Sequence, residues 1–290
     1  MKLAAIDIGS NAARMQISTV LTNDEVISFK KVEYVRFPLR LGHDVFTHGA
    51  LTPESVQRTV KLMQAYKLLM ELHEVESFMA CATSAMREAT NGPEVADLVK
   101  LRSGIPIHII DGQKEAELIN NVVVLALDER QTLHIDVGGG STELNVYKNR
   151  KKLASRSFKI GSVRLLEGKD MRSTWTKVEA WIAENIDRNE PVVAVGTGGN
   201  ISKLFNLVSK TSETTTTLPE IIRMQKYIAG FSLEERIHKL RLNADRADVI
   251  VPAAQIYISA MQWAGATEIA VPDLGLKDGI LQVVYRQLTQ

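Results

Sequence analysis

Two glycine-rich acidic turns, far apart in the chain, constrain the fold more than any other feature. They read Asp7-Ile8-Gly9-Ser10-Asn11 and Asp136-Val137-Gly138-Gly139-Gly140-Ser141, and each lies between two strand-like runs. The glycines of a P-loop or a dinucleotide fingerprint lead from a strand into a helix. Here they stand at the tip of a predicted β-hairpin, where successive amides can form an anion-binding nest beside an Asp. The two turns therefore predict two halves that clamp one phosphorylated ligand.

The similarity of the two halves extends beyond the turns. After each turn the sequence predicts a strand, a polar hairpin tip, a second strand and a glycine, which is Gly42 in the first half and Gly161 in the second. A helix, a strand and another helix follow in both halves. The matching order predicts an internal duplication of a βββαβα unit, with a fortuitous likeness of two α/β halves as the alternative.

Composition narrows the class of protein. The chain of 290 residues is 45% apolar and 24% charged, which is ordinary for a soluble globular protein. A net charge of +1 argues against nonspecific nucleic-acid binding as the main role, with a local basic groove as the open alternative. The longest apolar run, Val122 to Leu127, is far too short to span a membrane. The single cysteine, Cys81, lies in an apolar strand, so we expect an inert core thiol and a reducing, cytoplasmic location.

Local signals place several further elements. Thr52 and Pro53 predict the start of a helix, and Ser232 with Glu235 predicts a capping box at the start of another. The β-branched run 105–110 predicts a strand, followed by a helix over 114–127. The Thr-rich stretch 211–217 predicts a loop.

Five separated motifs carry a resemblance to a known family. They are DIGSN at 7–11, ATSAMRE at 82–88, DGQKEAEL at 111–118, DVGGGSTEL at 136–144 and GLKDGIL at 275–281. In order and wording they resemble the exopolyphosphatase/guanosine pentaphosphate phosphohydrolase (Ppx/GppA) family, within the actin/sugar-kinase/Hsp70 ATPase superfamily. The resemblance implies duplicated βββαβα domains of the ribonuclease H-like, actin-like type that flank a cleft. Their expected bounds are 1–127 and 128–275, with a last helix, 276–288, that packs back on the first domain.

The chain also departs from the family pattern. Larger members carry an extra C-terminal helical domain, and we expect the short two-domain form here. Ala12 replaces a frequent Ser or Thr, and Gly198-Gly199-Asn200 replaces a more usual Ser-Gly-Thr. These departures leave the length of the substrate and the recognition of a base open.

Three carboxylates are candidate ligands for Mg²⁺ or Mn²⁺. Asp7 and Asp136 stand beside the two glycine turns, and oxygen ligands suit a hard cation. Alternation along the strand after the second turn places Glu143 on the same face as Ser141. The alternatives are a turn-capping role for the two Asp residues and a solvated strand position for Glu143.

Glu115 is the candidate general base. It lies in the first turn of the helix after the 105–110 strand, and spacing alone favours simple compensation of the helix dipole. The resemblance changes this interpretation, because the catalytic glutamate of the family precedes the Ala of this motif, as Glu115 precedes Ala116. Glu117 points elsewhere around the helix.

Phosphate binding is expected from the turns and from residues that follow them. Arg87, near a helix start, offers a bidentate fork for phosphate, with a surface salt bridge to Glu88 or Glu94 as the alternative. The expected phosphate-binding set is Gly9, Ser10, Asn11, Arg14, Ser84, Arg87, Gly138, Gly139, Gly140, Ser141 and Thr142.

The resemblance implies an exopolyphosphatase-like hydrolase. It would release terminal orthophosphate from polyphosphate, with Mg²⁺ or Mn²⁺ as cofactor and a water activated by Glu115. The alternatives are a guanosine pentaphosphate 5′-phosphohydrolase, an ATP-hydrolysing or kinase relative, and a non-catalytic sensor of polyphosphate or guanosine tetraphosphate. We expect polyphosphate or guanosine pentaphosphate as the substrate and neither a specific nucleic acid nor a membrane as a partner, while a homodimer is an open alternative.

Overall fold

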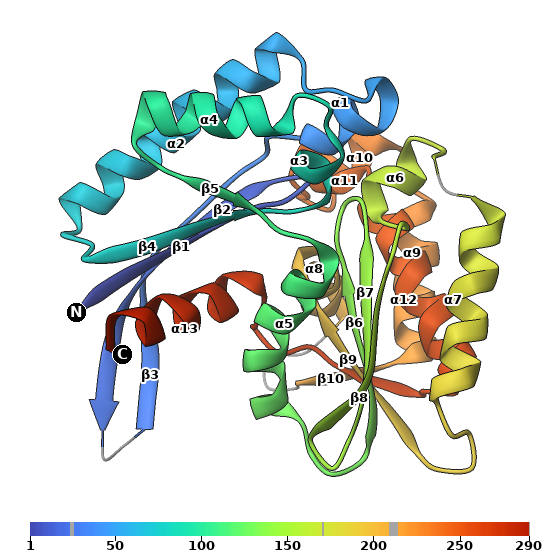
Figure 1. Cartoon of the computed structure of the whole chain (residues 1–290). Coiled ribbons are helices and arrows are strands. Elements are labelled where there is room, and N and C mark those ends of the chain that lie inside the picture. Colours follow the sequence, from blue (N-terminus) through green and yellow to red (C-terminus); the bar gives the residue numbers. More distant parts are fainter. Residues whose placement is uncertain (24–25, 170, 209–213, 290) are drawn as a thin grey trace. The chain divides into compact units, whose positions relative to one another are not determined.

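The chain forms two compact units, each a mixed β-sheet with helices packed on it (Figure 1). The structure is a computed structural model that describes residues 1–23, 26–169, 171–208 and 214–289. The first unit contains Met1–Val122 and Gly275–Gln290, and the second contains Val123–Leu274. The α/β class and the two-domain organisation expected from the sequence are confirmed.

The first unit is built on a five-stranded sheet with the order β3-β2-β1-β4-β5. β1 pairs antiparallel with β2 and parallel with β4. Its strands are β1 (Lys2–Ile8), β2 (Ala13–Asn23), β3 (Val26–Phe37), β4 (Ser77–Ala82) and β5 (Ile107–Ile109). Its helices are α1 (Leu41–His48), α2 (Pro53–Leu72), α3 (Ser84–Glu88), α4 (Gly92–Ser103), α5 (Gly112–Val123, whose last residue begins the second unit) and α13 (Leu276–Thr289).

The two faces of the first sheet are covered by different helices. Figure 1 shows α2 and α4 over one face and α13 over the other. Gln16 of β2 donates to Asp278 of α13 across 3.3 Å, so the face that carries Gln16 and Asp7 is the α13 face. The C-terminal helix α13 therefore packs on the sheet that begins the chain.

The second unit is built on a six-stranded sheet with the order β10-β11-β9-β6-β7-β8. β6 pairs antiparallel with β7 and parallel with β9, which repeats the β1 arrangement. Its strands are β6 (Gln131–Val137), β7 (Thr142–Lys148), β8 (Lys151–Phe158), β9 (Val192–Thr197), β10 (Thr215–Thr217) and β11 (Glu268–Ala270). Its helices are the 3₁₀ turn η1 (Val124–Ala126), α6 (Ser162–Leu166), α7 (Arg172–Asn185), α8 (Gly199–Val208), α9 (Leu218–Ala229), α10 (Leu233–His238), α11 (Ala244–Ala247) and α12 (Ile250–Ala264).

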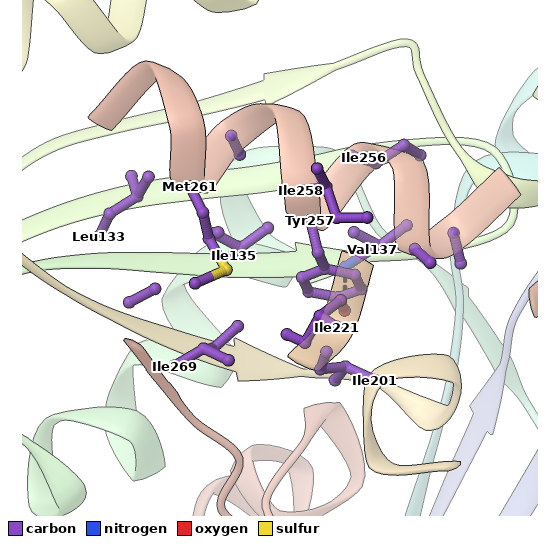
Figure 2. Close-up of a cluster of buried hydrophobic side chains, with 14 of the residues drawn as sticks. Leu133, Ile135, Val137, Ile201, Ile221, Ile256, Tyr257, Ile258, Met261 and Ile269 are labelled. Atoms are coloured by element: carbon purple, nitrogen blue, oxygen red, sulfur yellow. Dashed lines mark hydrogen bonds between the residues drawn. The ribbon is translucent and has the colours of Figure 1, made fainter. Parts of the chain in front are cut away.

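One face of the second sheet makes the core of its unit. Leu133, Ile135 and Val137 alternate along β6 and pack with Tyr257 and Met261 of α12 (Figure 2). Full burial of one such side chain contributes roughly 1.5–3 kcal/mol to folding, so this face adds substantially to the stability of the unit. Because alternate residues point the opposite way, His134 and Asp136 lie on the other face.

The helix starts that the sequence predicted from capping residues are confirmed. Thr52 accepts from the Ser55 amide at 3.3 Å with Pro53 as the first residue of α2, and Ser232 forms a reciprocal capping box with Glu235. The helix expected over 114–127 ends earlier, and η1 follows it, at a run of β-branched valines that weakens helix propensity.

Part of the expected 211–217 loop is a strand instead. Thr215–Thr217 forms β10, because β-branched residues pair well with the strand Glu268–Ala270. The earlier part of that stretch, 211–213, lies outside the described residues. Within the described ranges we find no helix with the length and apolar character needed to cross a bilayer.

Gly279→Ala is predicted to loosen the docking of α13 on α5. A Cβ at Gly279 would lie 2.0 Å from the carbonyl oxygen of Leu118, and backbone cannot move aside cheaply. Overpacking of this kind costs about 1–3 kcal/mol. Urea unfolding should show that loss for Gly279→Ala, whereas Gly275→Ala, with nothing within 4 Å of the added Cβ, should unfold like wild type. Equal stability of the two variants would contradict the close helix contact.

Candidate active site

A hydrogen bond within the first glycine turn closes it. Two further hydrogen bonds hold the turn from the segment that leads into α1. The Gly9 amide donates to the Ala12 carbonyl at 3.1 Å and closes the turn. The amides of Arg40 and Gly42 donate to the carbonyls of Asn11 (2.9 Å) and Ser10 (2.7 Å). Arg40 has a φ of 58°, a left-handed conformation that a non-glycine residue seldom adopts. The backbone thus accepts local strain in the segment that caps this turn.

The second glycine turn repeats this construction with α6. The Gly138 amide donates to the Ser141 carbonyl at 2.9 Å. The Gly138 and Gly139 carbonyls accept from the amides at the start of α6, and Arg164 Nε donates to the Gly140 carbonyl at 2.9 Å. Gly161 is required here, since a Cβ would lie 2.5 Å from the Gly139 carbonyl oxygen.

The direction of these carbonyls fixes the direction of the amides. In a trans peptide the C=O and the following N–H point opposite ways. Carbonyls 138–140 point toward α6, so the amides of Gly139, Gly140 and Ser141 point away from it. The same reasoning directs the amides of Asn11 and Ala12 away from α1. Each unit therefore presents a row of aligned N–H groups, the arrangement that binds anions.

The strand residues beside the two turns differ in charge. Asp7 pairs across the strands with Arg14, and their side chains form an ion pair of 2.7 Å. At the equivalent place in the second unit, Asp136 pairs with Glu143, which is 1% exposed and accepts from the Ser157 hydroxyl at 2.8 Å. Like charges directly opposite each other in a sheet are destabilising. The second unit thus gathers negative charge where the first unit has a balanced pair.

Glu115 lies in the first unit with a cation beside it. Its Oε2 is 3.9 Å from Arg87 of α3, and Arg87 also donates to the Ile110 carbonyl just before α5. The Asp111 carboxylate accepts from the Lys114 amide at 2.7 Å, which caps this helix end. Glu115 is only 8% exposed, whereas Glu117 is exposed and pairs with Lys114.

Cys81 lies beside Asp7 in the first sheet. It pairs with Asp7 in the sheet, and its burial together with the charges of Asp7 and Glu115 raises the pKa of the thiol to about 12. A thiol that stays protonated and buried is a poor nucleophile, which supports the expected inert role of Cys81.

A second row of polar side chains is buried on the same face of the sheet, two residues along the strands from Asp136 and Glu143. His134 Nδ1 lies 3.0 Å from the side-chain amide nitrogen of Asn145, and its Nε2 lies 2.9 Å from the Thr197 hydroxyl. Ser155 donates to Asn145 at 2.7 Å. Complete burial lowers the pKa of His134 to about 3. The ring is therefore neutral, accepting from Asn145 and donating to Thr197, and the row holds the end of β9 in place.

Comparisons with known proteins decide the family. Residues 19–287 match the model of the Ppx/GppA phosphatase family. The chain belongs to that family. It is 27% identical over 313 aligned residues to exopolyphosphatase 2 of Mycobacterium tuberculosis, a match that covers 96% of this chain and 97% of that protein. An Aquifex aeolicus family member of known structure has a TM-score of 0.76 at 26% identity and covers 100% of this chain and 98% of that one.

Other relatives of this phosphatase family are longer than this chain. A guanosine-5′-triphosphate,3′-diphosphate pyrophosphatase of Vibrio cholerae is 25% identical over 99% of the chain, which spans 60% of that protein. A bifunctional 3-dehydroquinate synthase/phosphatase of Fusobacterium nucleatum is 30% identical over 83% of the chain, which spans 36% of that protein. The recognition made from the five motifs is thus confirmed.

The structure brings two pairs of the expected site residues together within the first unit. Ser10 and Ser84 share a hydrogen bond of 2.8 Å, and Arg87 adjoins Glu115. Thr142 uses its hydroxyl locally, donating to the Ile160 carbonyl at 2.7 Å. In the described part of the chain, no three His, Cys, Asp or Glu side chains gather closely enough to hold a metal alone. The ligand set Asp7, Asp136 and Glu143 stays a prediction, as do the roles of the other site residues.

Several residues that shape the turns have no role that the sequence alone predicts. Gly42 and Gly161 occupy equivalent positions in the two halves, and that equivalence could have indicated their importance. Nothing in the sequence near Arg164 or Tyr257 indicates a role, because each acts through a contact with a distant segment. Burial, and to a lesser degree Asp136, raises the pKa of Tyr257 well above its usual value, so its hydroxyl stays protonated.

We predict that His134 does not titrate between pH 8 and pH 5, as followed by NMR of its imidazole. Its pKa is lower in the folded than in the unfolded chain, so the unfolded chain takes the proton first. Stability should therefore fall as pH falls below about 6.5, by at most about 1.4 kcal/mol per pH unit from this group. His134→Gln, which cannot take that proton, should show a shallower loss. An imidazole that titrates near pH 6.5 would refute the buried neutral ring.

Proposed function

We propose that this chain is a phosphohydrolase that removes terminal orthophosphate from polyphosphate. The observation that carries the proposal is the two rows of amides that point away from α1 and α6, one at each glycine turn, together with Glu115 beside Arg87. Amides held in fixed directions stabilise charge on a transferring phosphoryl group without rearrangement during the reaction. The family match and the near full-length similarity to an exopolyphosphatase support the choice of substrate.

In this mechanism Glu115 takes a proton from the attacking water. The water oxygen bonds to the terminal phosphorus, and the bond from that phosphorus to the bridging oxygen breaks. Orthophosphate leaves, and the remaining chain is shorter by one phosphate. Arg87 offsets the negative charge of Glu115 when an anionic substrate approaches, and Ser84 lies beside the first turn through its bond to Ser10.

The acidic residues of the second unit fit a divalent cation. Asp136 and Glu143 lie opposite each other on one face of the sheet, and a cation would relieve their repulsion. Mg²⁺ in phosphoryl-transfer sites commonly uses one or two carboxylates, with waters and substrate oxygens as its other ligands. When bound there, Mg²⁺ or Mn²⁺ would neutralise charge on the phosphate oxygens. Asp7, already paired with Arg14, is the weaker ligand of the three.

A guanosine pentaphosphate 5′-phosphohydrolase is the second candidate, because the Vibrio cholerae relative aligns with 99% of the chain. The same amide rows and base would serve either substrate. Phosphate release from short polyphosphate, long polyphosphate, guanosine pentaphosphate and ATP, measured side by side, separates the two activities. Release from polyphosphate at the highest kcat/KM is the expected result, and preference for the nucleotide would favour the second candidate.

Glu115→Gln tests the base directly. Glutamine keeps the shape of the side chain but cannot accept the proton, and loss of a general base typically costs about 10²–10⁴-fold in rate. Turnover should fall by that factor while polyphosphate affinity, measured by calorimetry, changes little. Glu117→Gln is the matched control, since it removes the same charge from the exposed side of α5.

The proposed base is wrong if both variants turn over like wild type with metal present. If wild type binds polyphosphate but releases no phosphate, the chain is a sensor and not an enzyme.

A further inference from the structure

The hydroxyl of Tyr257 joins two strands at the place where their pairing ends. Tyr257 projects from α12 into the core and is 0% exposed, and Figure 2 shows it pointing toward Val137. Its oxygen accepts from the Val137 amide at 3.2 Å and donates to the Thr197 carbonyl at 2.5 Å. The pairing of β6 with β9 ends at Asp136 and Thr197. The hydroxyl therefore bridges Thr197, the last paired residue of β9, and Val137, which lies one residue beyond the last paired residue of β6.

The groups around this hydroxyl belong to the proposed cation and phosphate site. Val137 lies between Asp136 and Gly138 in the second glycine turn, and Thr197 directly precedes Gly198. Gly198 has a φ of 105°, and a Cβ there would lie 3.0 Å from Asp136 Oδ1 and 3.4 Å from the Tyr257 oxygen. Gly198 thus lies close to both Asp136 and the Tyr257 hydroxyl, and that hydroxyl contacts the residues next to Asp136 and Gly198.

Two separate contacts fix Thr197 at this point. His134 holds its side chain and Tyr257 holds its carbonyl. The Val137 amide, in contrast, is held by its hydrogen bond to Tyr257, just before Gly138. Loss of the hydroxyl would leave a buried N–H and a buried C=O with one fewer partner each, and such groups relax by moving the backbone that carries them.

We propose that Tyr257 is a positioning residue that holds Asp136 and the Val137–Gly138 segment at the separation from Gly198 needed for cation and phosphate binding. This inference rests on the proposed function, but it concerns binding geometry rather than the base. It assigns Tyr257 no contact with substrate. Its role is to hold the Asp136–Gly138 segment and the Gly198 segment in fixed positions relative to α12.

Tyr257→Phe tests the proposal, because phenylalanine keeps the packed ring and removes both hydrogen bonds. Mn²⁺ serves as the probe, with free Mn²⁺ counted by electron paramagnetic resonance. We expect Mn²⁺ affinity to fall about tenfold, because Asp136 would have to be brought back to its position each time the cation binds, at a cost comparable to one hydrogen bond. Phosphate release should recover toward the wild-type rate at saturating Mn²⁺, which a general loss of structure would not allow.

Tyr147→Phe is the matched control. Tyr147 is 1% exposed and lies in the same sheet, toward the end of β7 away from the turn. Both variants should unfold at a lower temperature than wild type, but only Tyr257→Phe should change Mn²⁺ affinity. If Tyr257→Phe does not fold, 4-aminophenylalanine at position 257 replaces it in the same measurement, since it keeps a donor for Thr197 and accepts poorly from Val137.

Unchanged Mn²⁺ affinity in the folded variant, with wild type active, overturns the positioning role and leaves the proposed function standing. A wild type that binds Mn²⁺ but releases no phosphate overturns the proposed function, and the Mn²⁺ affinities still decide the role of Tyr257. A wild type that binds no Mn²⁺ overturns the cation site and this inference with it.

Discussion

The site depends on one interaction: the peptide carbonyls of each glycine turn are bound by the chain segment that follows the third strand. In the first unit the amides of Arg40 and Gly42 do this, and in the second the start of α6 and the Arg164 side chain do it. Once the carbonyls are held, the amides have no freedom of direction. A flexible glycine loop thereby becomes a rigid anion nest made of backbone amides.

The two units share this backbone device but differ in the side chains beside it. Asp7 faces Arg14 across the strands, whereas Asp136 faces Glu143. One exchange of residue type thus separates the roles: the first unit keeps balanced charge and holds the proposed base, Glu115, while the second concentrates acid where a cation is proposed. The two units of a duplicated fold can take different chemical roles in this way, because the same strand register places corresponding residue pairs opposite each other in both sheets.

Much of the fold could be predicted because its signals are local. Glycine turns, alternating strands, the Thr52 cap and the Ser232–Glu235 box each act within a few residues. The sequence could not show that Gly161 admits a carbonyl, that Arg164 binds the second turn or that Tyr257 bridges two strands, since each contact joins distant segments. The short strand Thr215–Thr217 was missed for the same reason, because its partner lies about fifty residues later.

The orientation of the turn amides is best tested by observing the amides themselves. Orthophosphate titrated into isotope-labelled protein, in the presence of Mg²⁺, should move the backbone amide resonances of Gly139, Gly140, Ser141, Asn11 and Ala12 downfield. The amides of Gly9 and Gly138, which close their own turns, should move less. Shifts confined to Gly9 and Gly138, or to residues away from both turns, would contradict the account.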